Sequence, residues 1–279
     1  MSIGQALNDM INKSKEAIQM EDGDYIGENG LLYCGKCNTP KQTQIEVLGR
    51  ISRPYCLCKC GAEKRDAEEK AKAQTEFDNR IKDLRRTGFP DSDMIQWNFA
   101  NDDMENEQIT KAMKRYVDNF PELKKQGKGL LLYGNVGRGK TYAACEVANA
   151  LIDKGYSVLV TNFSRVLNTL QSTFEKQEYI DSLNKFALLV IDDLGIERST
   201  EFAKEQVYNI IDSRYRAGLP MIITTNLSID KIKNPTDIEN GRIYDRIIER
   251  CFPLEVKGQN RRHKAVRESY GDMKELLGL

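Results

Sequence analysis

The chain has 279 residues, 40% of them hydrophobic, which is enough for one large domain with a smaller appended module. Its 42 basic and 42 acidic side chains cancel, which excludes a polycation held on DNA or on an anionic membrane by net charge alone. Because no run of about 18 apolar residues occurs and the start lacks an apolar signal-peptide core, we expect a cytoplasmic protein without membrane contact.

The N-terminal part of the sequence divides into a segment that contains cysteines and a segment rich in charge. A short amphipathic helix is expected over residues 2–20, followed by two hairpin-like pieces around the cysteines. The charged segment contains strong helix formers and ends at Gly88 and Pro90. We therefore predict a small module over residues 1–62 and a helical linker over residues 63–89.

Cysteine is concentrated in this small module, where five of the seven lie between positions 34 and 60. Clustered thiols in a reducing compartment indicate a metal site before they indicate disulfides. Four thiolates around zinc make a closed, structural site, and the single histidine, His263, is far away in sequence. Buried free thiols or a redox pair are the alternatives. The spacing leaves the ligand set open, and we favour Cys34, Cys37, Cys58 and Cys60, with Cys56 in place of either of the last two.

From about residue 90 the pattern changes to helical stretches that alternate with short apolar strands. The strand candidates are residues 129–133, 157–161, 187–191, 221–225 and 253–256. Nearly continuous apolar strands that alternate with helices are typical of a parallel sheet covered on both faces. The sequence therefore predicts an α/β domain over residues 90–279.

Residues 134–141, GNVGRGKT, lie between a predicted strand and a predicted helix, as a P-loop requires. The glycines let backbone N–H groups point at phosphates, and the helix N-terminus adds positive potential. Lys140 is expected to reach the β and γ phosphates and Thr141 to hold Mg²⁺. The predicted cofactors are ATP and Mg²⁺, and the predicted nucleotide-binding residues are Gly134, Asn135, Val136, Gly137, Arg138, Gly139, Lys140, Thr141 and Tyr142.

Another buried strand ends in two aspartates, Asp192 and Asp193. A carboxylate at the end of a strand beside the P-loop strand can hold the magnesium ion, and a second carboxylate can polarise the attacking water. We assign metal coordination to Asp192 and water activation to Asp193.

Arginine recurs every four residues at Arg242, Arg246 and Arg250, which places the three on one face of a predicted helix. This face is either an ordinary solvated surface or a source of an arginine finger for the ATP of a neighbouring subunit, with Arg246 the preferred finger. In the basic tail, Arg262 is our choice for an arginine that reaches the γ-phosphate in cis, and Arg261 is the alternative.

The motifs GLLLYGNVGRGKT, LLVIDDLG, TTN and RIYDR together resemble the AAA+ helicase loaders of the DnaC/DnaI type and the related IstB transposition ATPases. The resemblance covers about residues 90–265 and implies an AAA+ (ASCE) P-loop fold, with helices on both sides of the parallel sheet. In such oligomeric ATPases a polar residue at the tip of the strand between the P-loop and carboxylate strands helps to place the water, and Asn226 is the candidate. The family's motifs fall on Lys140, Thr141, Asp192, Asp193, Asn226, Arg246 and Arg262.

The resemblance also implies partners. A protein of this type hydrolyses ATP while it loads the replicative DNA helicase, binds single-stranded DNA, and forms a homo-oligomer when ATP is bound. In the DnaI-type layout the N-terminal part grips the helicase, so residues 1–62 are expected to dock it. Compact adaptors of this kind are often phage-borne, and we expect a phage or mobile-element version.

Two further sets of residues are candidates for ligand contact. Phe163, Arg165, Asn168 and Phe174 have the aromatic and polar character of a single-stranded DNA site, although an amphipathic helix with Val166, Leu167 and Leu170 inward explains the same segment. Adenine contacts are expected from Met94, Trp97 and Phe99, for which plain core packing is the alternative.

Other functions fit the sequence less well. A GTPase is disfavoured because no N-K-x-D segment is present, and a small-molecule kinase is disfavoured by the paired aspartates and the arginine row. An IstB-like transposition helper and a zinc adaptor with a nucleotide switch and little turnover remain alternatives to the helicase loader.

Overall fold

The computed structural model describes residues 20–47, 49–195, 200–261, 270, 273–274 and 276–278. The chain forms two compact units, Met1–Phe77 and Asp78–Leu279. The helix expected over residues 2–20 and the tail arginine Arg262 lie outside the described residues. No helix in the described part of the chain has the length and apolar character needed to cross a membrane.

The N-terminal unit contains two small antiparallel hairpins, as the sequence predicts. Strand β1 (Tyr25–Ile26) pairs with β2 (Leu32–Tyr33), and β3 (Ile45–Val47) pairs with β4 (Arg50–Ser52). Few apolar side chains are buried here: among the described residues of this unit they are Leu32, Cys34 and Cys58. A core this small does not supply enough apolar burial to offset the entropy of ordering the chain. The unit therefore needs another source of stability.

Helix α2 (Lys59–Gly88) contains the boundary between the two units and begins within the cysteine motif. Its buried residue is Gly88, and the exposed remainder carries weak i,i+4 ion pairs such as that of Lys64 with Glu68. Near its C-terminus Ile81 and Leu84 pack against the core of the second unit. Added bulk at Gly88 would meet a backbone oxygen, because a Cβ there would lie 2.5 Å from the carbonyl of Val158.

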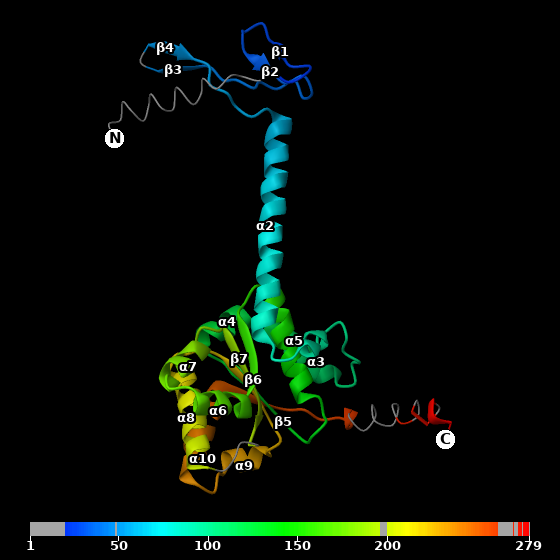
Figure 1. The fold of residues 1–279 in the computed structure, drawn as a ribbon, viewed down its shortest axis with the longest axis vertical. Coiled ribbons are helices and arrows are strands. Elements are labelled where there is room, and N and C mark those ends of the chain that lie inside the picture. The colour runs from blue at the N-terminus through cyan, green and yellow to red at the C-terminus, as the bar shows by residue number, and fades with distance from the viewer. Residues whose placement is uncertain are drawn as a thin grey trace. The chain divides into compact units, whose positions relative to one another are not determined.

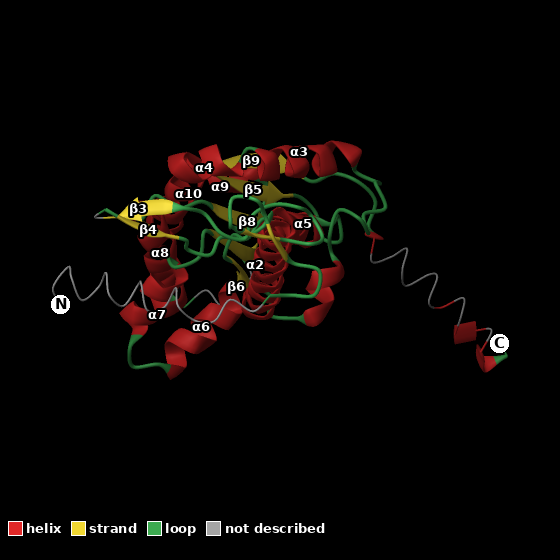
Figure 2. Ribbon diagram, turned by 90° about the horizontal axis from the view of Figure 1, so that it is seen from above, coloured by secondary structure: helices red, strands yellow, loops and turns green. Residues whose placement is uncertain are grey.

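The second unit is built on a parallel sheet with the strand order β6-β7-β8-β5-β9. This confirms the predicted α/β class with a parallel sheet, and Figures 1 and 2 show the helices packed around it. Each strand is connected to the next strand along the chain through one or more helices, as parallel pairing requires. The strands are β5 (Gly129–Tyr133), β6 (Val158–Asn162), β7 (Leu188–Leu194), β8 (Met221–Thr225) and β9 (Cys251–Glu255).

Side chains of the central strands alternate between two hydrophobic clusters, one on each face of the sheet. On β5, Leu130 and Leu132 enter the first cluster and Leu131 enters the second, as the period of two in a strand dictates. The first cluster is covered by α3 (Glu107–Asp118), α4 (Phe120–Gln126) and α5 (Lys140–Asp153), with the 3₁₀ helix η1 (Ser92–Gln96) beside α5. The second is covered by α6 (Phe163–Ser172), α7 (Lys176–Leu183), α8 (Glu201–Arg216), α9 (Ile229–Lys233) and α10 (Ile238–Arg250).

Candidate nucleotide-binding site and cysteine cluster

The P-loop connects the end of β5 to the start of α5 and takes a backbone course that glycine makes possible. Gly134 and Gly137 have φ values of 141° and 77°, which side chains of L-residues rarely adopt. A Cβ on Gly134 would also lie 2.6 Å from the carbonyl oxygen of Val256. The loop leads into an α-helix of 14 residues, whose N-terminal N–H groups and dipole favour an anion. These features fit a triphosphate.

Lys140 places its ammonium group inside this loop. The residue is 6% exposed, and its Nζ donates to the carbonyl oxygens of Gly134 and Asn135 at 2.8 and 2.9 Å. The same Nζ donates to Oδ1 of Asn226 at 2.7 Å. A buried ammonium needs such partners, and they hold the positive charge where the P-loop motif predicts the β and γ phosphates.

Asp192 and Thr141 form a cluster of oxygen atoms beside Lys140. Oδ1 of Asp192 accepts hydrogen bonds from the hydroxyls of Thr141 at 2.8 Å and Thr224 at 2.5 Å. Burial raises the pKa of the Asp192 carboxyl, while the bonds from Thr224 and Thr141 act in the opposite direction. Carboxylate and hydroxyl oxygens are the ligands that Mg²⁺ prefers, so these oxygen atoms fit the predicted magnesium ion.

Asp193 has an unusual backbone conformation at the carboxyl end of β7. Its φ is 60°, and the pairing of β7 with β8 shifts register between Ile191 and Leu194. The Asp193 N–H donates to the hydroxyl of Thr224 at 3.0 Å. A left-handed conformation at a residue other than glycine costs energy, and such strained residues cluster at functional sites, although aspartate tolerates the conformation better than most. The irregularity turns Asp193 out of the strand's regular alternation, which suits an independent role from Asp192.

Strand β8 lies between β5 and β7, which is the position expected for the strand that carries Asn226. Because the carboxyl ends of parallel strands meet at one edge of the sheet, Lys140, Asp192 and Asn226 converge there. A cavity of about 490 Å³ opens at the same edge and is lined by Asn135, Arg138 and Asn226, among others. Of the predicted site residues, Lys140, Thr141, Asp192 and Asn226 are therefore brought together at this edge.

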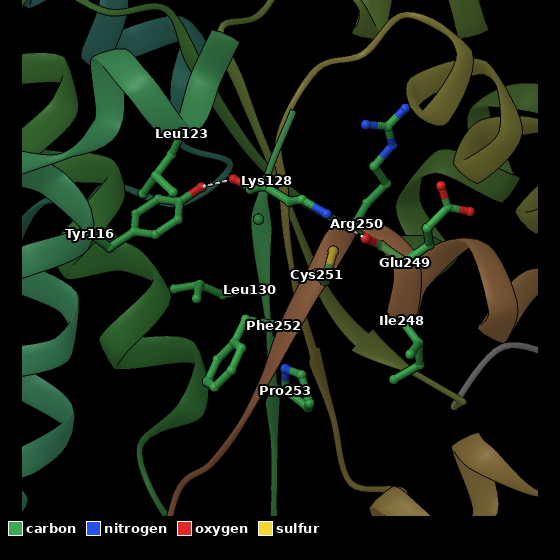
Figure 3. Close-up of a pocket in the computed structure, with 11 residues that line it drawn as sticks. Tyr116, Leu123, Lys128, Leu130, Ile248, Glu249, Arg250, Cys251, Phe252 and Pro253 are labelled. Atoms are coloured by element: carbon green, nitrogen blue, oxygen red, sulfur yellow. Dashed lines mark hydrogen bonds between the residues drawn. The ribbon is translucent and has the colours of Figure 1, made fainter. Parts of the chain in front are cut away.

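A second cavity, of about 440 Å³, lies at the amino ends of β5 and β9, on the side of the sheet away from the P-loop (Figure 3). It is lined mainly by apolar side chains around Lys128, Gly129 and Cys251, where β5 and β9 begin. Figure 3 shows the hydroxyl of Tyr116 bonded across it to the carbonyl of Lys128, at 3.0 Å. Because ligands of open parallel sheets bind at the carboxyl ends of the strands, we place the nucleotide at the P-loop edge.

The arginine row lies on α10, and its members differ in their surroundings. Nε of Arg246 is 2.6 Å from Oδ1 of Asp212 on the neighbouring helix α8, and its guanidinium stacks on Tyr208 at 4.7 Å. Arg250 stacks on Tyr215. The exposed Arg242 side chain makes no hydrogen bond or ion pair with any residue that the structure describes. Arg246 is therefore held within its own subunit, and its action on a neighbour's ATP stays a prediction.

Arg261, the alternative tail arginine, lies against the P-loop. Its backbone N–H donates to the carbonyl of Gly137 at 2.9 Å, and its guanidinium lies over the ring of Tyr142, 5.6 Å from the centroid. An ion pair at 2.8 Å joins it to Asp103. The acidic side chains of Asp102, Asp103 and Glu105 also lie near this guanidinium, and the sequence gives no signal for them because they have no fixed spacing to the P-loop.

The three adenine candidates pack along α5. Met94, Trp97 and Phe99 are partly buried against the first hydrophobic cluster, and the Trp97 ring stacks on Tyr142 with centroids 6.1 Å apart. Core packing therefore explains all three, and Trp97 also forms part of the surroundings of the P-loop helix.

The candidates for DNA contact divide between the core and the surface. Phe163 is 1% exposed and lies in the second hydrophobic cluster, so the proposed stacking of a base on Phe163 is wrong for this structure. It begins α6, whose buried face also contains Val166, Leu167 and Leu170. Arg165 and Asn168 lie on the exposed face of that helix, and Phe174 is fully exposed in the loop that follows. These three are accessible to a ligand.

Four cysteines come together in the N-terminal unit. The sulfur atoms of Cys34, Cys37, Cys58 and Cys60 all lie within 4.8 Å of one another, close to the roughly 3.8 Å separation expected around tetrahedral zinc with Zn–S bonds of about 2.3 Å. Cys56 lies outside this group, and its thiol donates to the carbonyl of Pro40 at 3.6 Å.

The protonation of these thiols also suits a metal site. A hydrogen bond from Thr39 contributes most to lowering the pKa of Cys37 to about 5, and the neighbouring thiols, Cys58 first, raise that of Cys60 to about 12. Thiolates this close repel one another, and a divalent cation bound between them would offset that repulsion. The donor set fits zinc.

The fold and the P-loop edge are those of the AAA+ family of nucleotide-binding proteins. The sequence model for the IstB-like ATP binding protein family matches residues 73–269, and the chain belongs to that family.

Among curated relatives, the replicative helicase loader DnaI of Bacillus subtilis (strain 168) is 28% identical over 168 residues, which are 56% of this chain and 52% of DnaI. The replicative helicase loader DnaC of Escherichia coli (strain K12) is 25% identical over 144 residues, 50% of this chain and 56% of DnaC. The chain thus spans about half the length of the curated relatives it matches.

The solved structures agree with this assignment. A crystal structure of DnaI superposes with a TM-score of 0.54 and 25% identity, covering 64% of this chain and 98% of that one. A putative primosome component from Streptococcus pyogenes serotype M3 has a TM-score of 0.50 and 26% identity, covering 59% of this chain and 87% of that one.

Proposed function

We propose that this protein is an ATP-dependent loader of a replicative DNA helicase, which hydrolyses ATP during loading. The observation that carries the proposal is the convergence of Lys140, Asp192 and Asn226 at one edge of the sheet, in a chain whose relatives are named as helicase loaders. A cytoplasmic location follows from that role.

The geometry supports a separate role in ATP hydrolysis for each of these residues. ATP with Mg²⁺ supplies the reactive phosphoanhydride. Lys140 neutralises the β and γ phosphates, while Thr141 and Asp192 provide oxygen ligands for the metal. The carboxylate of Asp193 accepts a proton from the attacking water, which Asn226 helps to orient. Arg262, or Arg261 in its place, contacts the γ-phosphate in cis.

The remaining surfaces fit the partners of a loader. A zinc ion held by the four cysteines would order the N-terminal unit, whose exposed Ile26, Ile51 and Tyr55 offer an apolar surface to the helicase. Arg165, Asn168 and Phe174 are available to phosphates and bases of single-stranded DNA.

We expect the protein to capture the replicative helicase of its host or mobile element and to transfer it onto single-stranded DNA when ATP is supplied. The measurement is co-purification with the helicase and with a transposase, followed by a helicase-loading assay on a DNA circle. Capture of the transposase alone would favour a transposition helper, the second candidate, which the IstB-like family supports and the cysteine cluster does not. Capture of neither partner would reject the loader.

We expect an Arg246→Ala variant to lose at least about a hundredfold in ATP turnover if Arg246 acts as an arginine finger. In a mixture with Lys140→Ala subunits, part of the activity should return, because an intact finger then faces an intact P-loop. Arg242→Ala is the matched control on the same helix face. Since Arg246 also pairs with Asp212, thermal unfolding of each variant must be measured. A folded Arg246→Ala protein with no recovery in the mixture would count against action in trans.

A further inference from the structure

We propose that Asp212 and Tyr208 of α8 are positioning residues, which hold the guanidinium of Arg246 on α10 so that its terminal nitrogens can bind the ATP of a neighbouring copy of the chain. Their role rests on the ATP hydrolysis and the arginine finger proposed above. It explains why Arg246, among the arginines of this helix face, is suited to act as the finger.

Asp212 is a buried carboxylate that binds two arginines. It is 7% exposed. Its Oδ1 accepts a hydrogen bond from Nε of Arg246 at 2.6 Å, and its Oδ2 lies 2.8 Å from Nε of Arg216. Because both oxygens are occupied, the carboxylate cannot rotate without breaking an ion pair. Two guanidinium groups share one carboxylate, so the cluster keeps a net positive charge that suits an anionic ligand.

Two aromatic rings of α8 hold the flat surface of the Arg246 guanidinium. Its Cζ lies 4.7 Å from the centroid of the Tyr208 ring and 5.7 Å from that of Tyr215. Contacts of this kind attract a planar cation to an aromatic ring. Together with the bond to Asp212, they order a long side chain before any ligand binds. Less rotamer entropy is then lost when Arg246 engages a phosphate.

The contacts of Arg246 leave part of its guanidinium for a ligand. Asp212 takes Nε, and Nη1 makes a long bond of 3.4 Å to the carbonyl of Arg242. Nη2 has no hydrogen-bond partner among the residues that the structure describes, and the side chain is 25% exposed. The terminal nitrogens of arginine form the fork that binds a phosphate at two points. A phosphate can therefore approach Arg246 while Asp212 still holds it.

The place of Arg246 in the fold separates it from the P-loop of its own subunit. Helix α10 covers one hydrophobic cluster and the P-loop helix α5 covers the other, so the sheet lies between them (Figures 1 and 2). Helix α10 leads directly into the amino end of β9 at Cys251, and Arg246 precedes that end by about 7 Å along the axis. The P-loop follows the carboxyl end of the parallel strand β5. A phosphate bound by Arg246 therefore belongs to another copy of the chain.

The other two arginines of this helix face are arranged differently. The side chain of Arg242 is exposed and makes no hydrogen bond or ion pair within the described part of the chain, so nothing there fixes its position. Arg250 stacks on Tyr215, and its two terminal nitrogens donate to the carbonyls of Gln126 and Tyr215 at 3.4 Å each. Arg246 combines an anchored Nε with a terminal nitrogen that is open to a ligand.

The test uses Asp212→Leu and Tyr208→Leu, measured for ATP turnover and for affinity for the β,γ-imido analogue of ATP. Leucine favours a helix, and the released arginines are partly exposed to water, so Asp212→Leu leaves no fully buried charge unpaired. We expect turnover to fall at least about tenfold in Asp212→Leu, because a displaced group loses its effect on the reaction. The fall should be about threefold in Tyr208→Leu. Affinity for the analogue should stay within about twofold in both, because their own P-loops are intact.

Mixtures of subunits show whether Asp212 acts on its own ATP or on that of a neighbour. Asp212→Leu mixed with Lys140→Ala should recover up to about a quarter of the original turnover, since an intact P-loop meets an intact finger at that share of randomly formed head-to-tail interfaces. Asp212→Leu mixed with Arg246→Ala should not recover, because neither subunit presents a working finger. Glu239→Gln is the matched control. It removes another ion pair between α8 and α10, with Lys204 at 3.0 Å, and should keep full turnover.

Full turnover in Asp212→Leu would overturn the proposal, and so would the absence of recovery in its mixture with Lys140→Ala. If Asp212→Leu does not fold, the same mixtures made with Tyr208→Leu decide in the same way. If Arg246→Ala keeps full turnover, the finger and its positioning residues are both rejected while nucleotide binding stands. An unsubstituted protein that does not bind the analogue would instead reject the proposed function.

Discussion

An Asp193→Asn variant should hydrolyse ATP at least about a hundredfold more slowly than the unsubstituted protein, while its affinity for ATP changes little. Asparagine cannot accept the proton of the attacking water, but it tolerates the left-handed backbone that Asp193 adopts at φ 60°. The substitution therefore removes the charge without removing the irregular end of β7. Single-turnover hydrolysis and equilibrium ATP binding, measured on the same preparation, separate the two effects.

A Lys140→Ala variant serves as the comparison, because it removes the ammonium group that Gly134, Asn135 and Asn226 hold in the loop. This variant should lose ATP affinity as well as turnover. If Asp193→Asn turned over ATP at close to the original rate, water activation would have to be assigned elsewhere. Loss of binding in Asp193→Asn would instead assign Asp193 to the metal or to the fold.

Replacing Cys34 by serine should abolish zinc binding and unfold the N-terminal unit. Zinc sites of this type contribute about 10–16 kcal/mol of apparent binding free energy at pH 7, and the two hairpins bury too few apolar side chains to fold without it. The ATPase unit has its own two hydrophobic clusters, so its thermal transition and its ATP affinity should persist. Zinc content and limited proteolysis check the two halves of this prediction.

Cys56→Ser is the matched control, because its thiol bonds to Pro40 and lies outside the four-cysteine group. It should retain one zinc ion per chain and the protease resistance of the N-terminal unit. Loss of zinc from Cys56→Ser together with its retention in Cys58→Ser would exchange the roles of these two residues. An N-terminal unit that stays folded in Cys34→Ser without zinc would contradict the need for a metal.

Features that depend on contiguous residues could be predicted from the sequence. The P-loop is one such feature, since its glycines, lysine and threonine act through neighbouring backbone groups. The five strands also appear as apolar runs close to their observed positions, although β9 begins at Cys251, two residues before the predicted range. Pro253 looks like the first residue of a strand in the sequence, but β9 is an edge strand, which tolerates proline inside it.

Features that depend on which side of an element faces the core were harder to predict. Phe163 looks equally suited to stacking on a base and to packing, and the buried face of α6 decides for packing. Glu146 is 2% exposed on α5, a degree of burial that the sequence of a charged residue does not reveal. For Arg246, helical spacing identified the face, but the partner Asp212 comes from α8.

The sequence by itself determined the chemistry that is available: a phosphate-binding loop, paired aspartates, a basic helix face and five clustered thiols. The tertiary structure decided how these groups combine. It inserts β8 between the P-loop strand and the aspartate strand, which brings Asn226 to Lys140, and it separates Cys56 from the other four cysteines. The physical reason is that strand order and cluster membership depend on packing between segments far apart in the chain, whereas a motif reports only its own neighbourhood.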